Sequence, residues 1–172
     1  MTMSSAGAGE TGFEPEAFRD VMAGVASPVT VVTGVSEGVP HGTTVSAFTS
    51  LSLSPPMVLV SLDRGSRLLE VVRGSGRFGV NVLSSHQAGL ALRFARKGGA
   101  EKFDGTEWSL VHGLPRLPEA TGWLACETET LVDGGDHVVL LGRVLSAEHR
   151  VAPPLTYHAR AFGTHSMLAA SA

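Results

Sequence analysis

The chain has 172 residues, of which 43% are hydrophobic, and it carries a formal net charge of −3 at pH 7. This length is enough for one complete core and too short for two comfortable domains. The basic residues are scattered, and no apolar stretch is long enough to cross a bilayer. We therefore expect neither a nucleic-acid partner nor a membrane partner.

Cysteine usage and the first residues indicate the compartment. Cys126 is the only cysteine, which excludes an intramolecular disulfide and a dithiol redox centre within one chain. We interpret it as a small core residue on a strand. The first residues lack the basic start and apolar region of a signal peptide, so we expect a cytoplasmic protein. Residues 1–12 have little to bury, and they are expected to form a disordered tail.

The first half of the chain begins with an amphipathic helix, because Phe18, Val21 and Val25 recur at helical spacing. A second helix is expected after Ser66, a residue type that caps helix N-termini, with Gly74 and Gly76 ending it. Turn residues separate the apolar runs between these helices, which is typical of short strands. In chain order the sequence predicts a helix over 14–23, strands over 28–34, 41–53 and 57–62, the second helix, and a strand over 77–83.

The second half begins with a helix capped by Ser84 or Ser85 and ends in paired strands. The turn at 133–136 reads Asp-Gly-Gly-Asp, which is a strong hairpin signal. The expected elements after the helix are a loop-rich segment over 101–119, strands over 122–132 and 137–149, and a short strand near 157–162.

The order of the elements favours a mainly β protein. Strand pairs are joined by tight turns more often than by helices, which indicates an antiparallel β-barrel with added α-helices rather than a doubly wound sheet. We expect a single domain over 13–166, flanked by the tail over 1–12 and a C-terminal tail over 167–172.

Several familiar motifs are absent or misplaced. Residues 7–12 and 74–79 match the glycine fingerprint for dinucleotides, but neither lies between a strand and a following helix, where the pyrophosphate would meet the helix N-terminus. Any nicotinamide cofactor is therefore held in another way. The histidines are not paired at the spacing of a zinc protease, and no serine-hydrolase elbow is present. We expect no metal site.

Four features carry the functional interpretation, and each also has a structural one. The strand over 42–50 is rich in hydroxyls and is either a solvent-facing edge or a platform for a polar, planar ligand. The cluster over 61–67 is either a capped helix with solvated charges or a phosphate site. Asn81 lies in an apolar strand and either faces outward or, if it is buried, needs hydrogen-bond partners. His137 follows the hairpin turn and is either part of that turn or a donor to a cofactor at the mouth of the barrel.

Taken together, these segments resemble the flavin reductase-like family, which includes the reductase components of two-component flavin-dependent monooxygenases. The resemblance runs from about Phe18 to Phe162, and its strength lies in the order and spacing of stretches that are each weak alone. The matching stretches are PVTVVT over 28–33, GTTVSAF over 42–48, LSLSPP over 51–56, GRFGVNVL over 76–83, RFAR over 93–96, KF over 102–103 and GDH over 135–137.

The resemblance implies an FMN-binding split barrel with Greek-key antiparallel strands, usually a homodimer. It also implies a set of cofactor-binding residues, with His137 as the residue that meets the nicotinamide. The implied flavin contacts are Thr44, Val45, Ser46 and Ala47 along the ring and ribityl chain, Ser61, Leu62, Ser66 and Arg67 along the ribityl phosphate, Asn81 and Val82 flanking it, and Phe94, Ala95, Arg96 and Lys102 on the phosphate side.

Two positions depart from the family pattern. Similar proteins often have serine where this chain has Ala47, so one side-chain hydrogen bond to the flavin is missing while main-chain contacts survive. They also often have threonine in place of Arg67. An arginine at that position either binds a phosphate through two hydrogen bonds or points to solvent.

The implied function is an NAD(P)H:flavin oxidoreductase that passes a hydride from NADH or NADPH to FMN or FAD and supplies reduced flavin to a partner oxygenase. The protein places the two rings at contact distance, because the cofactors supply the chemistry. The sequence chooses neither the flavin nor the nicotinamide. Two alternatives stay open: a flavin-binding electron-transfer or storage protein without reductase activity, and an enzyme that itself acts on an organic substrate with bound flavin.

Overall fold

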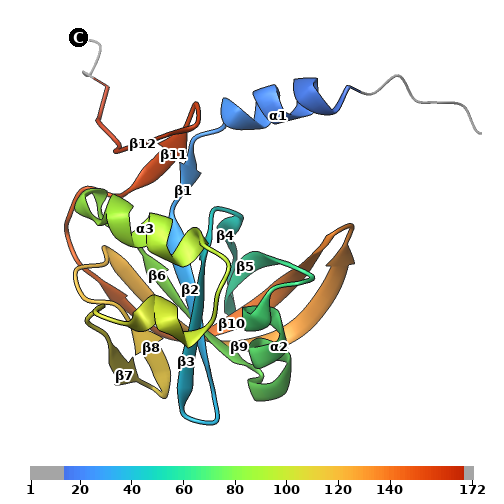
Figure 1. Cartoon of the computed structure of the whole chain (residues 1–172), viewed down its shortest axis with the longest axis vertical. Helices are drawn as coiled ribbons and strands as arrows, with labels where there is room; N and C mark the ends of the chain where they lie inside the picture. The colour runs from blue at the N-terminus through green and yellow to red at the C-terminus, as the bar shows by residue number, and fades with distance from the viewer. Residues whose placement is uncertain (1–13, 169–172) are drawn as a thin grey trace, which may run out of the picture.

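The computed structural model describes residues 14–168, and it is mainly β, as predicted (Figure 1). The predicted tail over 1–12 lies outside the described residues, as does most of the tail over 167–172. The helices are α1 Pro15–Ala23, α2 Arg67–Ser75 and α3 Ala88–Ala95, with 3-10 turns η1 Ser85–Gln87 and η2 Ala100–Phe103. The strands are β1 Ser27–Pro28, β2 Thr30–Ser36, β3 Val39–Val45, β4 Phe48–Leu53, β5 Pro56–Asp63, β6 Arg77–Val82, β7 Ser109–Val111, β8 Leu114–Arg116, β9 Gly122–Gly134, β10 His137–His149, β11 Thr156–His158 and β12 Ala161–Gly163.

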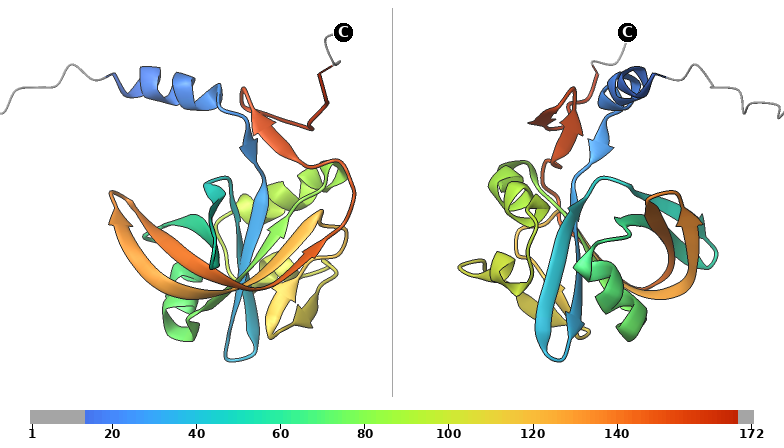
Figure 2. Two further views of the ribbon diagram at one scale, coloured as in Figure 1. Left: turned by 180° about the vertical axis from the view of Figure 1, so that it is seen from behind. Right: turned by 45° about the vertical axis from the view of Figure 1, so that its right-hand side comes forward.

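One seven-stranded antiparallel sheet dominates the molecule, with the strand order β3-β2-β6-β9-β10-β5-β4. The sheet is strongly curled, and α2 lies between the β2–β3 hairpin and the β9–β10 hairpin (Figure 2). Apolar side chains from β2, β5, β6 and β10 meet inside the curl with those of α2 to form the main core. A second core forms where α3 and η2 pack on the β2–β3 side.

The predicted strand over 41–53 is two strands, because the chain bends at Ser46 and Ala47. β3 pairs with β2 and β4 pairs with β5, so the bend carries the chain from one edge of the sheet to the other. The Ser61 amide donates to the Ala47 carbonyl at 3.0 Å and joins the bend to β5. The two edges of the curled sheet therefore meet at this bend, as expected for a split barrel.

The predicted helices and hairpin are present, with differences at their ends. Ser66 is the N-cap of α2, although its hydroxyl makes no capping hydrogen bond. The helix ends at Gly76, whose φ of 68° lies in the left-handed region that glycine tolerates. Gly74, which we expected to help end α2, lies inside it. Ser84 and Gln87 form a capping box before α3.

Cys126 is fully buried in the main core, as predicted. Burial raises the pKa of its thiol to about 12, because the thiolate would lose its hydration. In residues 14–168 we find no helix with the length and apolar character needed to cross a membrane.

Candidate functional site

A small cavity lies at the bend between β3 and β4, and we call it the rim cavity. Its volume is 200 Å³, and Thr43 and Asp63 line it together with residues that the sequence predicted for cofactor binding. The predicted residues that meet there are Thr44, Val45, Ser46, Ala47, Ser61, Leu62, Ser66 and His137. Three strands (β3, β5 and β10), the bend after β3 and the start of α2 contribute them, so the curl of the sheet brings the predicted set together.

The wall of the rim cavity is formed mostly by residues with short neutral side chains. The amides of Ser46 and Ala47 lie outside the strand ladders, because the ladders stop at Val45 and resume at Phe48. The Thr44 hydroxyl donates to the Ala91 carbonyl of α3 at 2.7 Å, so this side chain anchors the strand to a helix. Such a wall can contact the edge of a flat, polar ring through its main-chain groups.

His137 borders the rim cavity as the first residue of β10. Its Nδ1 lies 2.8 Å from the Asp136 carboxylate, and its side chain is 42% exposed. The hydrogen bond from His137, followed by its charge, lowers the pKa of Asp136. Asp136 holds one ring nitrogen, and within residues 14–168 no protein group bonds Nε2, which can meet a ligand.

The hairpin that carries His137 is fastened to the α2 side of the molecule by Arg64. The Arg64 Nε donates to the Gly135 carbonyl at 2.8 Å, and its guanidinium pairs with Asp133 at 2.8 Å. The Arg64 amide donates to the Asp136 carbonyl at 3.0 Å. These three bonds fix the position of the turn, and therefore of His137, beside the start of α2.

A second cavity adjoins the rim cavity, and we call it the cationic cavity. Its volume is 570 Å³, and it shares Thr43, Asp63 and Ser66 with the rim cavity. The N-terminus of α2 opens onto it, where helix amides favour an anion. The predicted residues that line it are Ser66, Arg67, Ala95, Arg96 and Lys102, joined by Lys97.

Lys102 is the most buried cation of this cavity, at 8% exposed. Its ammonium donates to the carbonyls of Gly42 and Phe94, each at 3.2 Å. Burial lowers its pKa, and the nearby Glu101 carboxylate partly offsets that effect. A lysine ammonium has three N–H donors, so one donor is left for an anion in the cavity.

Asn81, Val82 and Phe94 do not line either cavity. Asn81 is fully buried and donates to the carbonyls of Val31 and Pro115, at 3.2 and 3.4 Å, and it accepts from the Leu117 amide at 2.7 Å. Its expected hydrogen-bond partners are therefore main-chain groups of the protein. A direct cofactor contact by Asn81 stays a prediction.

Val82 and Phe94 likewise contact other residues of the protein. The Val82 carbonyl accepts hydrogen bonds from the amide and hydroxyl of Thr121 at 2.8 and 3.1 Å. The ring of Phe94 packs edge-on against Phe103, with ring centroids 4.9 Å apart, while its carbonyl holds Lys102. Their predicted cofactor contacts also remain predictions.

Sequence reasoning missed His41, which lines the cationic cavity. Its Nδ1 is buried and has no hydrogen-bond partner among residues 14–168. The pKa of His41 is lowered, first by burial and then by the charge of Arg67. Alternate residues of a strand share one face, so the spacing of His41, Thr43 and Val45 was the available signal. Asp63 was noticed as part of the charged cluster but was not assigned to the site.

The two cavities together fit a flavin nucleotide. The rim cavity offers neutral polar groups to a planar ring, and the adjoining cationic cavity offers Arg67, Lys102 and helix amides to a phosphate. The rim cavity has mainly neutral groups with the one carboxylate of Asp63, and the cationic cavity has an excess of cations, which matches the distribution of charge along such a ligand.

The chain belongs to the flavin reductase-like family, because residues 22–166 match the model of the Flavin reductase like domain. It is 41% identical over 147 residues to the reductase component of a 4-nitrophenol 4-monooxygenase/4-nitrocatechol 2-monooxygenase from Rhodococcus opacus, covering 85% of this chain and 78% of that protein. It is 36% identical over 156 residues to the FMN reductase (NADH) SmoA from Agrobacterium fabrum, covering 90% and 88%. It is also 39% identical to a probable flavin reductase from Rhizobium meliloti, and this match covers 80% of the present chain but only 44% of that longer protein.

A solved structure agrees with these relatives. The NADH:FAD oxidoreductase SgcE6 from Streptomyces globisporus C-1027, in complex with NAD and FAD fragments, superposes with a TM-score of 0.82 at 31% identity. The match covers 87% of this chain and 91% of that one. The predicted family and the predicted mainly β split barrel are therefore confirmed.

Proposed function

We propose that this chain is an NAD(P)H:flavin oxidoreductase that reduces FMN or FAD by hydride transfer and supplies the reduced flavin to a partner monooxygenase. The observation that carries the proposal is the continuity of the rim and cationic cavities, which share Thr43, Asp63 and Ser66. The relatives support it, since they include an NADH-dependent FMN reductase, an NADH:FAD oxidoreductase and a monooxygenase reductase component.

In this proposal the residues of the chain bind and orient the cofactors. The main chain at Ser46 and Ala47 faces the isoalloxazine, and Arg67 and Lys102 hold the phosphate. The bound flavin supplies the acceptor for the hydride of the nicotinamide. His137 positions the nicotinamide through Nε2, while Asp136 fixes the orientation of its ring. No side chain needs to act as a nucleophile.

A homodimer and a cytoplasmic location also belong to the proposal. β4 is an edge strand that exposes Leu51 and Leu53, the latter at 90%, and a second copy would cover this apolar edge. The single cysteine is buried, so the protein needs no oxidising compartment for its stability. Sedimentation equilibrium tests the dimer, and a monomeric mass at micromolar concentration would contradict it.

A steady-state assay of the purified protein tests the reductase. NADH and NADPH are each combined with FMN, FAD and riboflavin, and nicotinamide oxidation is followed at 340 nm by absorbance. We expect NADH or NADPH oxidation that depends on added flavin, and we expect the enzyme to turn over repeatedly. Tight, stoichiometric flavin without turnover would instead favour the electron-transfer or storage protein. Release of reduced flavin is measured by adding a separate flavin-dependent oxygenase behind a dialysis membrane.

A further inference from the structure

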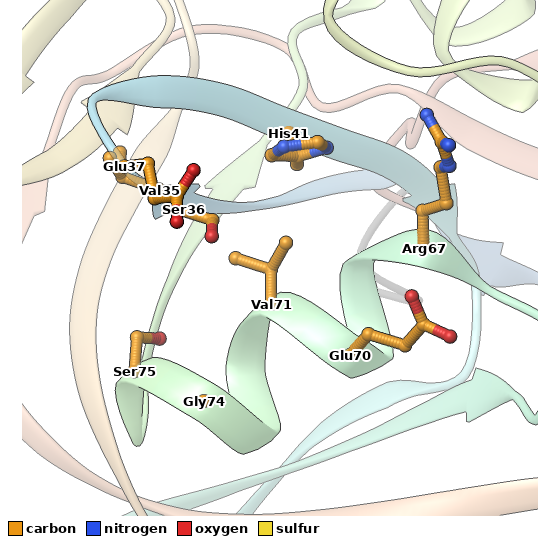
Figure 3. Close-up of a pocket in the computed structure, with 9 residues that line it drawn as sticks. All are labelled: Val35, Ser36, Glu37, His41, Arg67, Glu70, Val71, Gly74 and Ser75. Atoms are coloured by element: carbon orange, nitrogen blue, oxygen red, sulfur yellow. The ribbon is translucent and has the colours of Figure 1, made fainter.

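A third cavity lies between α2 and the β2–β3 hairpin, and we call it the outer cavity (Figure 3). Its volume is 590 Å³. It shares His41 and Arg67 with the cationic cavity, so it begins where the proposed phosphate site ends. The rim, cationic and outer cavities therefore follow one another along the same side of the molecule.

The balance of charge in the outer cavity differs from that of the cationic cavity, where four cationic side chains outnumber the carboxylates of Asp63 and Glu101. Glu37 and Glu70 line it with two carboxylates, and Ser36 and Ser75 add hydroxyls. Carboxylates accept hydrogen bonds from a ribose diol and from an exocyclic amine, whereas they repel a phosphate. The lining therefore suits a neutral nucleoside rather than a second free anion.

His41 and Val71 give this cavity a flat ring and an apolar contact. Figure 3 shows the His41 imidazole and the Val71 side chain pointing toward each other across the cavity. The buried Nδ1 of His41 has no partner within residues 14–168. An aromatic base can stack on such a ring and pack against the Val71 methyl groups.

Arg67 stands at the junction of the two cavities. Its side chain is exposed at the start of α2 and borders both spaces. A guanidinium can bind two phosphate oxygens at once, and it is the side chain best suited to a pyrophosphate bridge. The rim cavity is therefore lined mainly by neutral groups, the cationic cavity has an excess of cations, and the outer cavity has an excess of carboxylates. FAD has a matching order of ring, pyrophosphate and adenosine.

We infer that the outer cavity binds the adenosine half of FAD, so that FAD rather than FMN is the flavin that this chain uses. The inference rests on the proposed reductase function and deepens it. NADH is the other source of an adenosine group, but its nicotinamide must lie on the flavin ring beside His137. Of the three cavities, His137 lines only the rim cavity, and the cationic cavity lies between the rim cavity and the outer one.

The test compares FAD with FMN in the wild-type protein and in a variant with a blocked outer cavity. Gly74 lines the outer cavity, and a Cβ added there meets no atom within 4 Å, so Gly74→Trp introduces a bulky ring at the cavity wall without a clash at its Cβ. The matched control is Arg73→Trp, on the residue of α2 that precedes Gly74. Arg73 does not line the outer cavity.

We expect the wild-type KM for FAD to be about tenfold or more below that for FMN, the effect of one or two good hydrogen bonds. Gly74→Trp should remove most of this difference by raising the KM for FAD. Arg73→Trp should preserve the difference. Equal wild-type KM values for the two flavins, or an equal rise for both in Gly74→Trp, would overturn the inference and leave the reductase proposal standing.

Two further measurements keep the outcomes distinct. Glu70→Gln keeps the size of the side chain and removes its charge, so it should raise the KM for FAD alone even if Gly74→Trp folds poorly. The KM for NADH is measured in both variants with FMN as the acceptor. A rise in that value would mean that the cavity holds the adenosine of NADH, contrary to the inference. If the wild-type protein showed no flavin-dependent oxidation of NADH or NADPH at all, that result would instead contradict the reductase function.

Discussion

The two ends of the proposed flavin groove are built from different parts of the chain. At the rim cavity, the main chain of the β3–β4 bend and short side chains such as Ser61 form the wall. At the cationic cavity, long charged side chains from α2 and from the segment after α3 form it, chiefly Arg67, Arg96 and Lys102. One end depends on backbone geometry, and the other depends on individual charges.

The difference predicts how each end responds to substitution. A main-chain contact survives the exchange of one small side chain for another, because the amide stays in place. A charge-assisted hydrogen bond disappears with its side chain. Substitutions at the phosphate end should therefore have large effects on flavin affinity, and substitutions at the ring end should have small ones.

The largest effect is expected for Lys102→Met. A hydrogen bond to a charged group contributes about 1.5–3 kcal/mol, so the KM for FMN should rise by roughly 10- to 100-fold. Riboflavin has no phosphate, and its KM should change by less than about threefold. The control is Lys97→Met, which removes an exposed cation of the same cavity. Equal losses for FMN and riboflavin would show that Lys102 supports the fold and not the phosphate.

Asn81→Ala tests whether Asn81 stabilises the fold through its buried hydrogen bonds or contacts the flavin directly. The substitution leaves the Leu117 amide without its side-chain acceptor and removes one donor from each of the Val31 and Pro115 carbonyls, and we expect the free energy of unfolding to fall by about 2–4 kcal/mol. Urea denaturation measures the loss. Thr33→Val is the control, since it removes one bond to the same Pro115 carbonyl and should cost about 1 kcal/mol. A rise in flavin KM with unchanged stability would favour a direct contact instead.

Asn81 also shows what the sequence could not settle. Its need for partners was predictable from the apolar strand around it, but their identity was not. The main core covers one face of β6 and β8 covers the other. Alternation of polar and apolar residues along the strand therefore cannot identify a solvent-facing side. The bend at Ser46 was hidden for a similar reason. The polar pattern continues through it, and only the pairing of β4 with β5 reveals it.

The phosphate end was more accessible to sequence reasoning. A cap residue followed by Arg67 predicts a helix start with a cation, which is a local signal. The outer cavity left no such signal, because Glu37 and Glu70 come from a hairpin and a helix that meet only in the fold. Local motifs were therefore predictable, whereas cavities made by distant segments were not.

His137→Ala should separate the nicotinamide from the flavin. Loss of one exposed hydrogen bond is expected to raise the KM for NADH about tenfold and to change the KM for the flavin by less than about threefold. Asp136→Asn is the companion variant, which keeps the imidazole and weakens its orientation, so its effect on NADH should be smaller. Unchanged NADH kinetics in His137→Ala would remove this residue from the site.

His41 gives the phosphate end a pH dependence of stability. Its pKa in the folded protein lies below the ordinary histidine value of 6.5, because burial and the charges of Arg67 and Lys102 disfavour the imidazolium, with Glu101 opposing them. Below pH 6.5 the unfolded chain therefore binds more protons at this residue than the folded one, so stability is lost as the pH falls. Above pH 6.5 this contribution is constant.

The variant His41→Gln should lose that part of the acid sensitivity. The quantity to compare is the difference in free energy of unfolding between wild type and variant, measured by urea denaturation from neutral pH down to about pH 5. We expect the difference to shift in favour of the variant as the pH falls. A difference that stays constant over this range would show that His41 titrates alike in both states.

The smallest effect is expected at the ring end, for Ala47→Ser. Similar proteins often have serine at this position, yet the Ala47 carbonyl already accepts from the Ser61 amide at 3.0 Å, and its own amide faces the bend whatever the side chain. Because the added hydroxyl is exposed to water, the KM for FMN should fall by no more than about threefold. A fall of tenfold or more would mean that side chains, and not main chain, determine affinity at the rim, and the contrast between the two ends would fail.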